Sequence, residues 1–285
     1  MATLIDLRRR VRSVKSTMQI TRAMKLVSAS KLRRAQERMM ASRPYAAKMN
    51  QVLASLASRA NPEDHPLLRV KGDQNVELLV ITADKGLCGA FNANLIKAAL
   101  HFLDERKNHN LSLHIVGRKA HDFFKRRQFK ITQQYLNVFR KVQYTDAKEI
   151  AGNAIKSYMD SDLDAIYMVY NEFKTTLQQR VVVKRLLPLE RLPEKTVEPA
   201  LDYIYEPSPE VIFDRLLPLY VEFQVFQALL ESAAAEQAAR MTAMDSATEN
   251  AREVIDSLTL TMNKIRQAGI TREIIEVVSG AEGLS

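Results

Sequence analysis

Apolar residues at the start of the chain recur at alternating steps of three and four positions. This spacing places side chains along one side of a helix, so residues 3–59 are predicted to form one long helix. The chain has no glycine before position 72, Pro44 is expected to kink the helix, and Asn61-Pro62 should end it. The predicted seam runs through Leu4, Leu7, Val11, Val14, Met18 and Thr21 and continues less regularly through Met24, Val27, Ala29 and Leu32.

The end of the chain repeats this spacing over residues 209–278, with a kink expected at Pro218. A single helix of such length cannot bury its own seam. The two terminal helices are therefore predicted to wind about each other as a long antiparallel coiled coil. The predicted seam of the second helix is Phe226, Leu230, Ala233, Gln237, Arg240, Met244, Ala247, Ala251, Val254, Leu258, Thr261, Ile265 and Ala268.

The residues between these tracts change to short apolar runs that alternate with helical patterns. Strand–helix alternation predicts a mixed, largely parallel sheet, here a Rossmann-like α/β domain inserted between the two helices. We expect an N-terminal helix at 1–60, an α/β domain at 74–200, a proline-rich connector at 188–209 and a C-terminal helix at 209–285. The predicted strands are 76–83, 111–117, 129–135, 164–170 and 179–186, and the predicted helices are 93–106, 119–127 and 146–159.

Charge is distributed unevenly over the 285 residues, whose formal net charge is +9. Residues 1–60 carry 14 Lys and Arg against 2 acidic residues, whereas residues 209–285 carry 6 against 12. The opposite signs favour pairing of the two ends. The surplus of positive charge suggests a further partner, which could be nucleic acid, a membrane or an acidic protein surface. No apolar run reaches about 18 residues, so no transmembrane helix is expected.

Motifs of catalysis are scarce in the sequence. Residues 84–89 (DKGLCG) follow a predicted strand, where a nucleotide-binding loop would lie, but they lack the glycine spacing of one. They also suit a tight turn in which Gly86 and Gly89 relieve backbone strain. The lone Cys88 could be a nucleophile or a small buried residue, and it excludes an intrachain disulfide, which suits a reducing compartment. The five histidines have no metal-ligand spacing, and His114 is expected on a sheet face.

Two functions from different classes remain open on these patterns alone. One is an α/β nucleotide-handling enzyme with helical arms, which would need a catalytic cluster at the strand ends. The other is a basic coiled-coil protein that binds nucleic acid. The first helix is basic enough, but it has no aromatic residue before Tyr45 on which bases could stack.

Four segments in order along the chain resemble the γ subunits of F-type rotary ATP synthases. They are 20–32 (ITRAMKLVSASKL), 86–92 (GLCGAFN), 244–251 (MDSATENA) and 263–281 (NKIRQAGITREIIEVVSGA). The resemblance implies a coiled coil of the terminal helices with an α/β domain between them. It also implies a central rotor shaft without an active site. Chloroplast members carry an inserted dithiol switch, which one cysteine cannot form, so a bacterial type is indicated.

The same resemblance implies the partners of the chain: the α and β subunits in an α3β3 ring, the ε subunit and the ring of c subunits. It implies no cofactor, no metal, no nucleic acid and no homo-oligomer, and a peripheral place at the cytoplasmic face of a bacterial membrane, held only through the complex. It places contacts with ε and the c-ring at Tyr203, Tyr205 and Glu206. It places contacts with the stator at Met24, Lys85, Cys88, Arg266, Gln267, Thr271 and Glu273.

Overall fold

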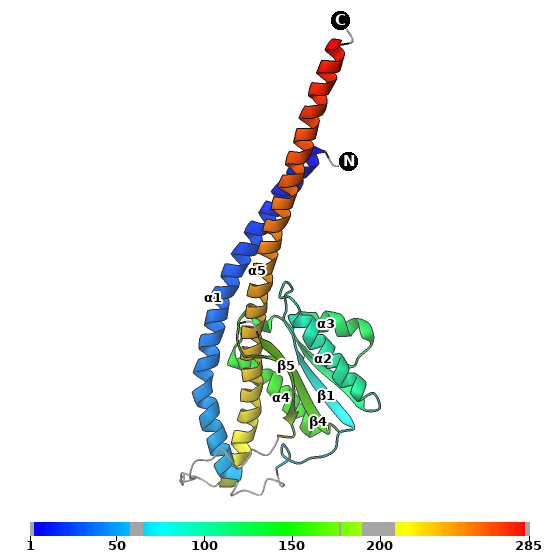
Figure 1. Cartoon of the computed structure of the whole chain (residues 1–285). Helices are drawn as coiled ribbons and strands as arrows, with labels where there is room; N and C mark the ends of the chain where they lie inside the picture. The colour runs from blue at the N-terminus through cyan, green and yellow to red at the C-terminus, as the bar shows by residue number, and fades with distance from the viewer. Residues whose placement is uncertain (1–2, 58–64, 177, 190–208, 283–285) are drawn as a thin grey trace. The chain divides into compact units, whose positions relative to one another are not determined.

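The computed structural model describes residues 3–57, 65–176, 178–189 and 209–282. Two long helices dominate it (Figure 1): α1 spans Leu4–Ala57 and α5 spans Pro209–Glu282. Pro44 and Pro218 both lie inside these helices, which continue past them. Both long helices are therefore present as predicted, and none of the described helices is long and apolar enough to cross a membrane.

The chain forms two compact units. One consists of Met1–Ser28 and Met241–Ser285, and the other of Ala29–Arg240. Each long helix contributes to both units. The predicted division into 1–60, 74–200 and 209–285 stays a prediction.

A five-stranded sheet forms the centre of the unit Ala29–Arg240. Its strand order is β3-β2-β1-β4-β5, in which the first four strands are parallel and β5 is antiparallel to β4. The sheet is therefore mixed and largely parallel, as the strand–helix alternation predicts. The strands are β1 (Asn75–Ile81), β2 (Asn110–Val116), β3 (Ile131–Tyr135), β4 (Ala165–Phe173) and β5 (Gln179–Leu187).

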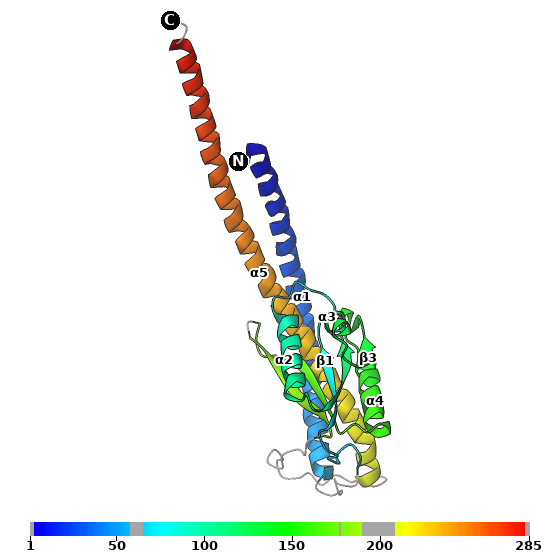
Figure 2. The ribbon, with the colours of Figure 1, turned by 90° about the vertical axis from the view of Figure 1, so that its right-hand side faces the viewer.

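Helices cover both faces of this sheet, because β1 is apolar on both of its sides. Val76, Leu78 and Val80 pack with α2 and α3 in one core cluster. Leu79 and Ile81 pack with α4, and with the parts of α1 and α5 in this unit, in a second cluster. Figure 2 shows the sheet between α2 and α4. The short elements are α2 (Phe91–Glu105), α3 (Arg118–Phe124), η1 (Lys125–Arg127), η2 (Val138–Arg140) and α4 (Tyr144–Asp160).

Within this unit, α1 and α5 lie antiparallel over the second cluster. Met49 and Leu53 of α1 belong to the same apolar cluster as Val221 of α5. The rings of Tyr45 and Phe223 pack with their centroids 5.0 Å apart.

The unit of Met1–Ser28 and Met241–Ser285 is a helix pair. Thr21 contacts Thr248 and Lys25 contacts Asp245, so higher numbers on α1 meet lower numbers on α5. This order makes the pair antiparallel, which confirms the fold class predicted for the terminal helices.

The seam of this helix pair differs in part from the predicted one. Val27 and Val254, both predicted in the seam, are 55% and 45% exposed. Ser28 is buried next to Val27, Thr248 is buried next to the predicted Ala247, and Ile255 is buried next to Val254. The true seam keeps a strict alternation of three and four residues and accepts polar side chains. A prediction that chooses the nearest apolar residue at each step therefore shifts the seam by one position wherever the true seam residue is polar.

Candidate partner-contact sites

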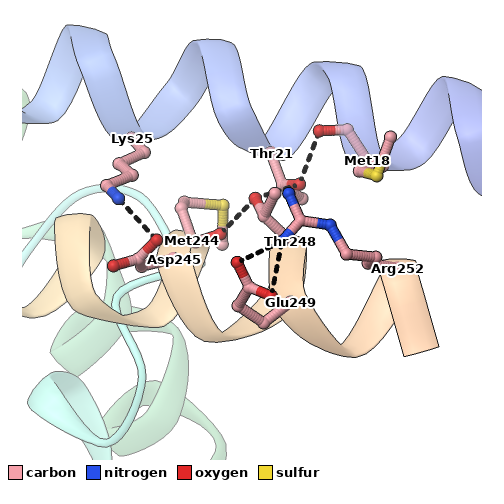
Figure 3. A network of polar contacts seen from close by, with 8 residues as sticks. All are labelled: Met18, Thr21, Lys25, Met244, Asp245, Thr248, Glu249 and Arg252. Atoms are coloured by element: carbon pink, nitrogen blue, oxygen red, sulfur yellow. Dashed lines mark hydrogen bonds and ion pairs between the residues drawn. The ribbon is translucent and has the colours of Figure 1, made fainter.

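Two threonines join the terminal helices inside their seam (Figure 3). Thr21 Oγ1 lies 2.8 Å from Thr248 Oγ1, and each side chain is 8% exposed. Thr21 also approaches the Met18 carbonyl oxygen at 3.0 Å, and Thr248 approaches that of Met244 at 2.7 Å. Each hydroxyl has one proton, so one threonine donates across the seam while the other donates to its own helix. Two small polar groups are thereby satisfied where little apolar area is buried.

An ion pair lies one helical turn from the threonines. Lys25 Nζ donates to Asp245 Oδ1 at 2.5 Å, but both side chains are more than a third exposed. Such a pair contributes at most about 1 kcal/mol to stability. Met24 is half-buried beside Lys25. Complementary charge of the terminal helices therefore stabilises this pair only weakly.

Most positive charge at the start of α1 stays on the surface. The basic side chains there are exposed in the helix pair, where they can meet an acidic partner, and Arg9 also lies 3.1 Å from Asp6. The exposed cations are Arg8, Arg9, Arg10, Arg12, Lys15 and Arg22.

The turn between β1 and α2, residues 84–89, is held by side chains on both sides. The Asp84 carboxylate accepts hydrogen bonds from the backbone N–H groups of Asn137 at 2.9 Å, Arg118 at 3.1 Å and Phe139 at 3.3 Å. Asn92 accepts from the Ala83 N–H at 3.0 Å and donates to the Lys85 carbonyl at 3.3 Å. These bonds fix a turn that presents the exposed Lys85 side chain.

The backbone of this turn corrects one expectation. Gly89 has φ +55°, so glycine relieves strain there as predicted, but Gly86 has no positive φ. The other left-handed residue is Leu87, with φ +60° and a side chain that is 64% exposed. A non-glycine residue in this conformation is strained, and an exposed leucine lacks burial to offset the strain. Leu87 is thus a surface feature of the turn that sequence patterns did not reveal.

Cys88 is 1% exposed, which agrees with the interpretation as a small buried residue. Burial raises the pKa of its thiol, against the opposing effect of the nearby Arg240 guanidinium. A neutral, covered thiol is a poor nucleophile. Cys88 therefore serves the packing of the turn, while Lys85 and Leu87 form its surface.

A buried ion pair ties α5 to the same turn. Arg240 donates to the Glu236 carboxylate at 2.6 Å and to the Gly86 carbonyl oxygen at 3.1 Å. The Arg240 and Glu236 side chains are only 10% and 5% exposed. Burial raises the pKa of Glu236, and the attraction of Arg240 opposes that rise. The sequence placed Arg240 in the helix seam. The sequence signal for its additional contact with the turn is the opposite-charge pair Glu236 and Arg240, four positions apart in an alanine-rich, glycine-free stretch.

A second buried polar group lies inside the sheet around His114, which is buried in β2 as a sheet-face residue. His114 Nδ1 lies 3.3 Å from Glu77 Oε1 on β1, and Thr132 donates to the other Glu77 oxygen at 2.7 Å. Tyr135 Oη lies 3.3 Å from His114 Nε2 on the opposite side of the ring. Within the described residues, no group of three side chains is arranged to hold a metal ion.

The end of α5 is exposed on all sides. Every residue from 264 to 279 is exposed, including Arg266, Gln267, Thr271 and Glu273. Thr271 donates to the Gln267 carbonyl of its own helix at 3.0 Å. Several large apolar side chains share this exposure, and such a surface marks a region that another protein covers. They are Ile265, Ile270, Ile274, Ile275, Val277 and Val278.

The structure brings the predicted site residues together in part. Lys85 and Cys88 share one turn, and the four predicted residues of α5 share one exposed helix end. Met24 lies in the helix pair next to the threonine contact. Tyr203, Tyr205 and Glu206 lie outside the described residues.

Two long terminal helices and a mixed five-stranded sheet define the class of this protein, an α/β protein with a terminal antiparallel helix pair and much exposed helix surface. A protein-family model described as ATP synthase matches residues 3–284. The ATP synthase gamma chain of Solibacter usitatus (strain Ellin6076) is 51% identical over 285 residues, covering 99% of this chain and 99% of the relative. The chain therefore belongs to the ATP synthase gamma chain family.

Solved structures share the fold. A chain in the central stalk and c-ring structure of the Tetrahymena thermophila mitochondrial ATP synthase has a TM-score of 0.61 and 27% identity, covering 80% of this chain and 99% of that one. A chain of the Euglena gracilis mitochondrial ATP synthase has a TM-score of 0.68 and 20% identity, covering 99% and 94%, which shows the fold alone. The comparisons do not favour the nucleic-acid-binding or nucleotide-handling interpretations.

Proposed function

We propose that the chain is the central rotor shaft of an F-type ATP synthase. It couples proton-driven rotation of a c-ring to ATP synthesis or hydrolysis at the β subunits. The observation that carries this proposal is the exposed end of α5, residues 264–279, whose apolar and polar side chains are not covered by any of the described residues. Helix surface of this kind requires surrounding protein, and an α3β3 ring would supply it.

The proposed role needs no active site in this chain. Nucleotide chemistry would belong to the β subunits, and the shaft would act by presenting different surfaces to them as it turns. The fixed turn at 84–89 suits this task, because Lys85 stands on a base held by Asp84, Asn92 and Arg240. A cation on a rigid base transmits force to an acidic partner better than one on a loose loop.

The polar helix contacts suit a shaft that must rotate inside a ring. Exposed Arg266 and Gln267 would form hydrogen bonds with the stator that break and reform, as would Thr271 and Glu273. Exposed polar contacts are individually weak, so they give angular preference without permanent attachment. We assign Met24, Lys85 and Cys88 to the same coupling surface, with Cys88 acting as buried support of the turn.

The contacts of this chain with a c-ring and an ε subunit are inferred from its sequence and its relatives. The Tetrahymena thermophila structure named above contains a central stalk with a c-ring. We propose that this chain likewise meets a c-ring and an ε subunit, through Tyr203, Tyr205 and Glu206. It would then lie at the cytoplasmic face of a bacterial membrane and be attached only through the complex.

Reconstitution tests this function. The chain is combined with α, β, ε and membrane sectors, and proton-driven ATP synthesis is compared for the native chain and Arg266→Ala/Gln267→Ala. The variant should assemble and stay folded but lose coupled synthesis. The matched control is Arg272→Ala, which removes a cation from another face of the same exposed helix. Failure of the native chain to support synthesis would reject the function. Unchanged synthesis in the double variant would reject the two residues.

A further inference from the structure

A hollow of about 800 Å³ lies on the unit Ala29–Arg240 (the α/β unit), between α2 and the start of β5. Its volume falls in the range of small-molecule sites. None of its residues belongs to the surfaces assigned above to coupling. It is lined by Asn94, Lys97, Ala98 and His101 from α2 and by Lys174, Gln178, Gln179, Arg180 and Val181 from β5 and the turn before it.

Positive side chains from two elements meet around this hollow. Positions 94, 97, 98 and 101 share one face of α2, which directs Lys97 and His101 to the same side. Arg180 and Lys174 approach from the strand side. None of the described residues that line the hollow is a carboxylate. Glu172, the cross-strand neighbour of Arg180, and Glu105 lie beside the wall and contact Lys174 and His101, so the net positive charge of the wall comes from Lys97 and Arg180.

Two cations of the wall, Lys97 and Arg180, are exposed and form no ion pair with the described residues. By contrast, Lys174 Nζ lies 2.7 Å from Glu172, and His101 lies 3.4 Å from Glu105. Lys97 and Arg180 are thus available for an external anion.

The rest of the wall is suited to the same kind of ligand. The side-chain amides of Asn94 and Gln178 supply neutral N–H donors, and the Gln179 amide, which donates to the Thr176 carbonyl oxygen at 3.0 Å, has one further N–H. Ala98 and Val181 pack against the apolar cluster under α2, so the floor is anchored in the core of the unit. A cation-rich wall with amide donors on a fixed floor matches an anion that carries several acceptor oxygens.

We propose that this hollow binds an oligophosphate, an anion with two or more linked phosphate groups, free or as part of a nucleotide. Lys97 and Arg180 neutralise its charge and the amides donate to its remaining oxygens. The arginine guanidinium can donate two parallel hydrogen bonds to one phosphate group. A ligand with only one carboxylate would leave most of the cations and amide donors of the wall without an acceptor. This site is independent of the proposed function, because none of its residues contributes to the coupling surface.

Calorimetric titration of the full chain with pyrophosphate tests the site, with inorganic phosphate and citrate as comparison anions. Pyrophosphate should bind saturably and more tightly than either. Lys97→Ala/Arg180→Ala should weaken that binding by about tenfold or more. The matched control Lys148→Ala/Lys156→Ala removes two exposed cations from α4, on the other face of the sheet.

Three results would overturn the proposal. The first is the absence of saturable pyrophosphate binding, and the second is citrate binding as tight as that of pyrophosphate. The third is an equal loss of binding in the Lys97→Ala/Arg180→Ala and control variants, which would indicate general surface charge. Coupled ATP synthesis is measured separately, so failure here leaves the rotor function standing.

Discussion

Replacing Arg240 by methionine tests whether the buried ion pair holds α5 to the turn at 84–89. The substitution removes the 2.6 Å bond to Glu236 and the 3.1 Å bond to the Gly86 carbonyl oxygen, while methionine keeps most of the side-chain volume. Glu236, 5% exposed, would remain as a carboxylate without its cation.

The expected cost follows from that isolated charge. Removing one partner of a buried pair costs about 3–5 kcal/mol, because the remaining charge stays desolvated. Burial already raises the pKa of Glu236 above its ordinary value, and loss of Arg240 raises it further. A folded-state pKa above the unfolded value favours the folded state at low pH, and this benefit is lost as pH rises through the folded pKa. The stability deficit of Arg240→Met should therefore be largest at alkaline pH and shrink as pH falls through the raised folded-state pKa toward the ordinary value of 4.5.

Urea unfolding at two pH values measures this deficit. The control is Glu236→Leu/Arg240→Met, in which both charges are gone and most of the stability should return. A deficit below about 1 kcal/mol for Arg240→Met would refute the reasoning, since an exposed pair contributes no more than that. An equal deficit at both pH values, or no recovery in the double variant, would refute it as well.

Three other predictions concern single residues. Gly117→Ala should destabilise the chain by about 3 kcal/mol or more, because Gly117 has φ +94° and an added Cβ would lie 2.0 Å from the Thr82 carbonyl oxygen. Gly152→Ala, which adds a Cβ in open space, should instead stabilise the chain slightly. Equal melting temperatures of the two variants would contradict this prediction. Cys88 should react with iodoacetamide far more slowly in the native chain than in urea, since its thiol is buried; equal rates would show an open turn. Burial alone would raise the pKa of Glu77, but the contacts with its polar neighbours lower this pKa on balance. Ionised Glu77 therefore stabilises the fold at pH values above its ordinary pKa of 4.5, and this contribution is lost as pH falls through the lowered pKa. Glu77→Gln should flatten that acid loss in an unfolding titration, and an unaltered acid limb would remove Glu77 as its source.

Periodicity predicted the regular elements of this fold well. The strand predicted at 111–117 is β2 at Asn110–Val116, and the helix predicted at 146–159 is α4 at Tyr144–Asp160. Such elements follow local rules, because a buried strand is an apolar run and a covering helix is amphipathic. Periodicity failed where polar side chains took seam positions. Ser28 and Thr248 are buried in the helix pair, and Thr248 has a hydroxyl partner on the other helix that no local pattern reveals.

The candidate sites were less predictable because they depend on tertiary contacts. The bond from Arg240 to the Gly86 carbonyl joins residues 154 positions apart, and spacing along the sequence does not reveal it. The left-handed backbone at Leu87 was also missed, since glycine is the residue usually found there. Position on a helix was predictable: Arg266 and Gln267 lie on α5 as expected, whereas their contacts with the stator stay a prediction.

Direct observation of rotation tests the central claim most sharply. The α3β3 ring is fixed to a surface, the chain is inserted, and a bead is attached through an engineered cysteine on an exposed residue of the α/β unit. With ATP present, the bead should turn continuously in one direction and stop when ATP is removed. A complex that assembles and hydrolyses ATP while the bead stays still would contradict the account.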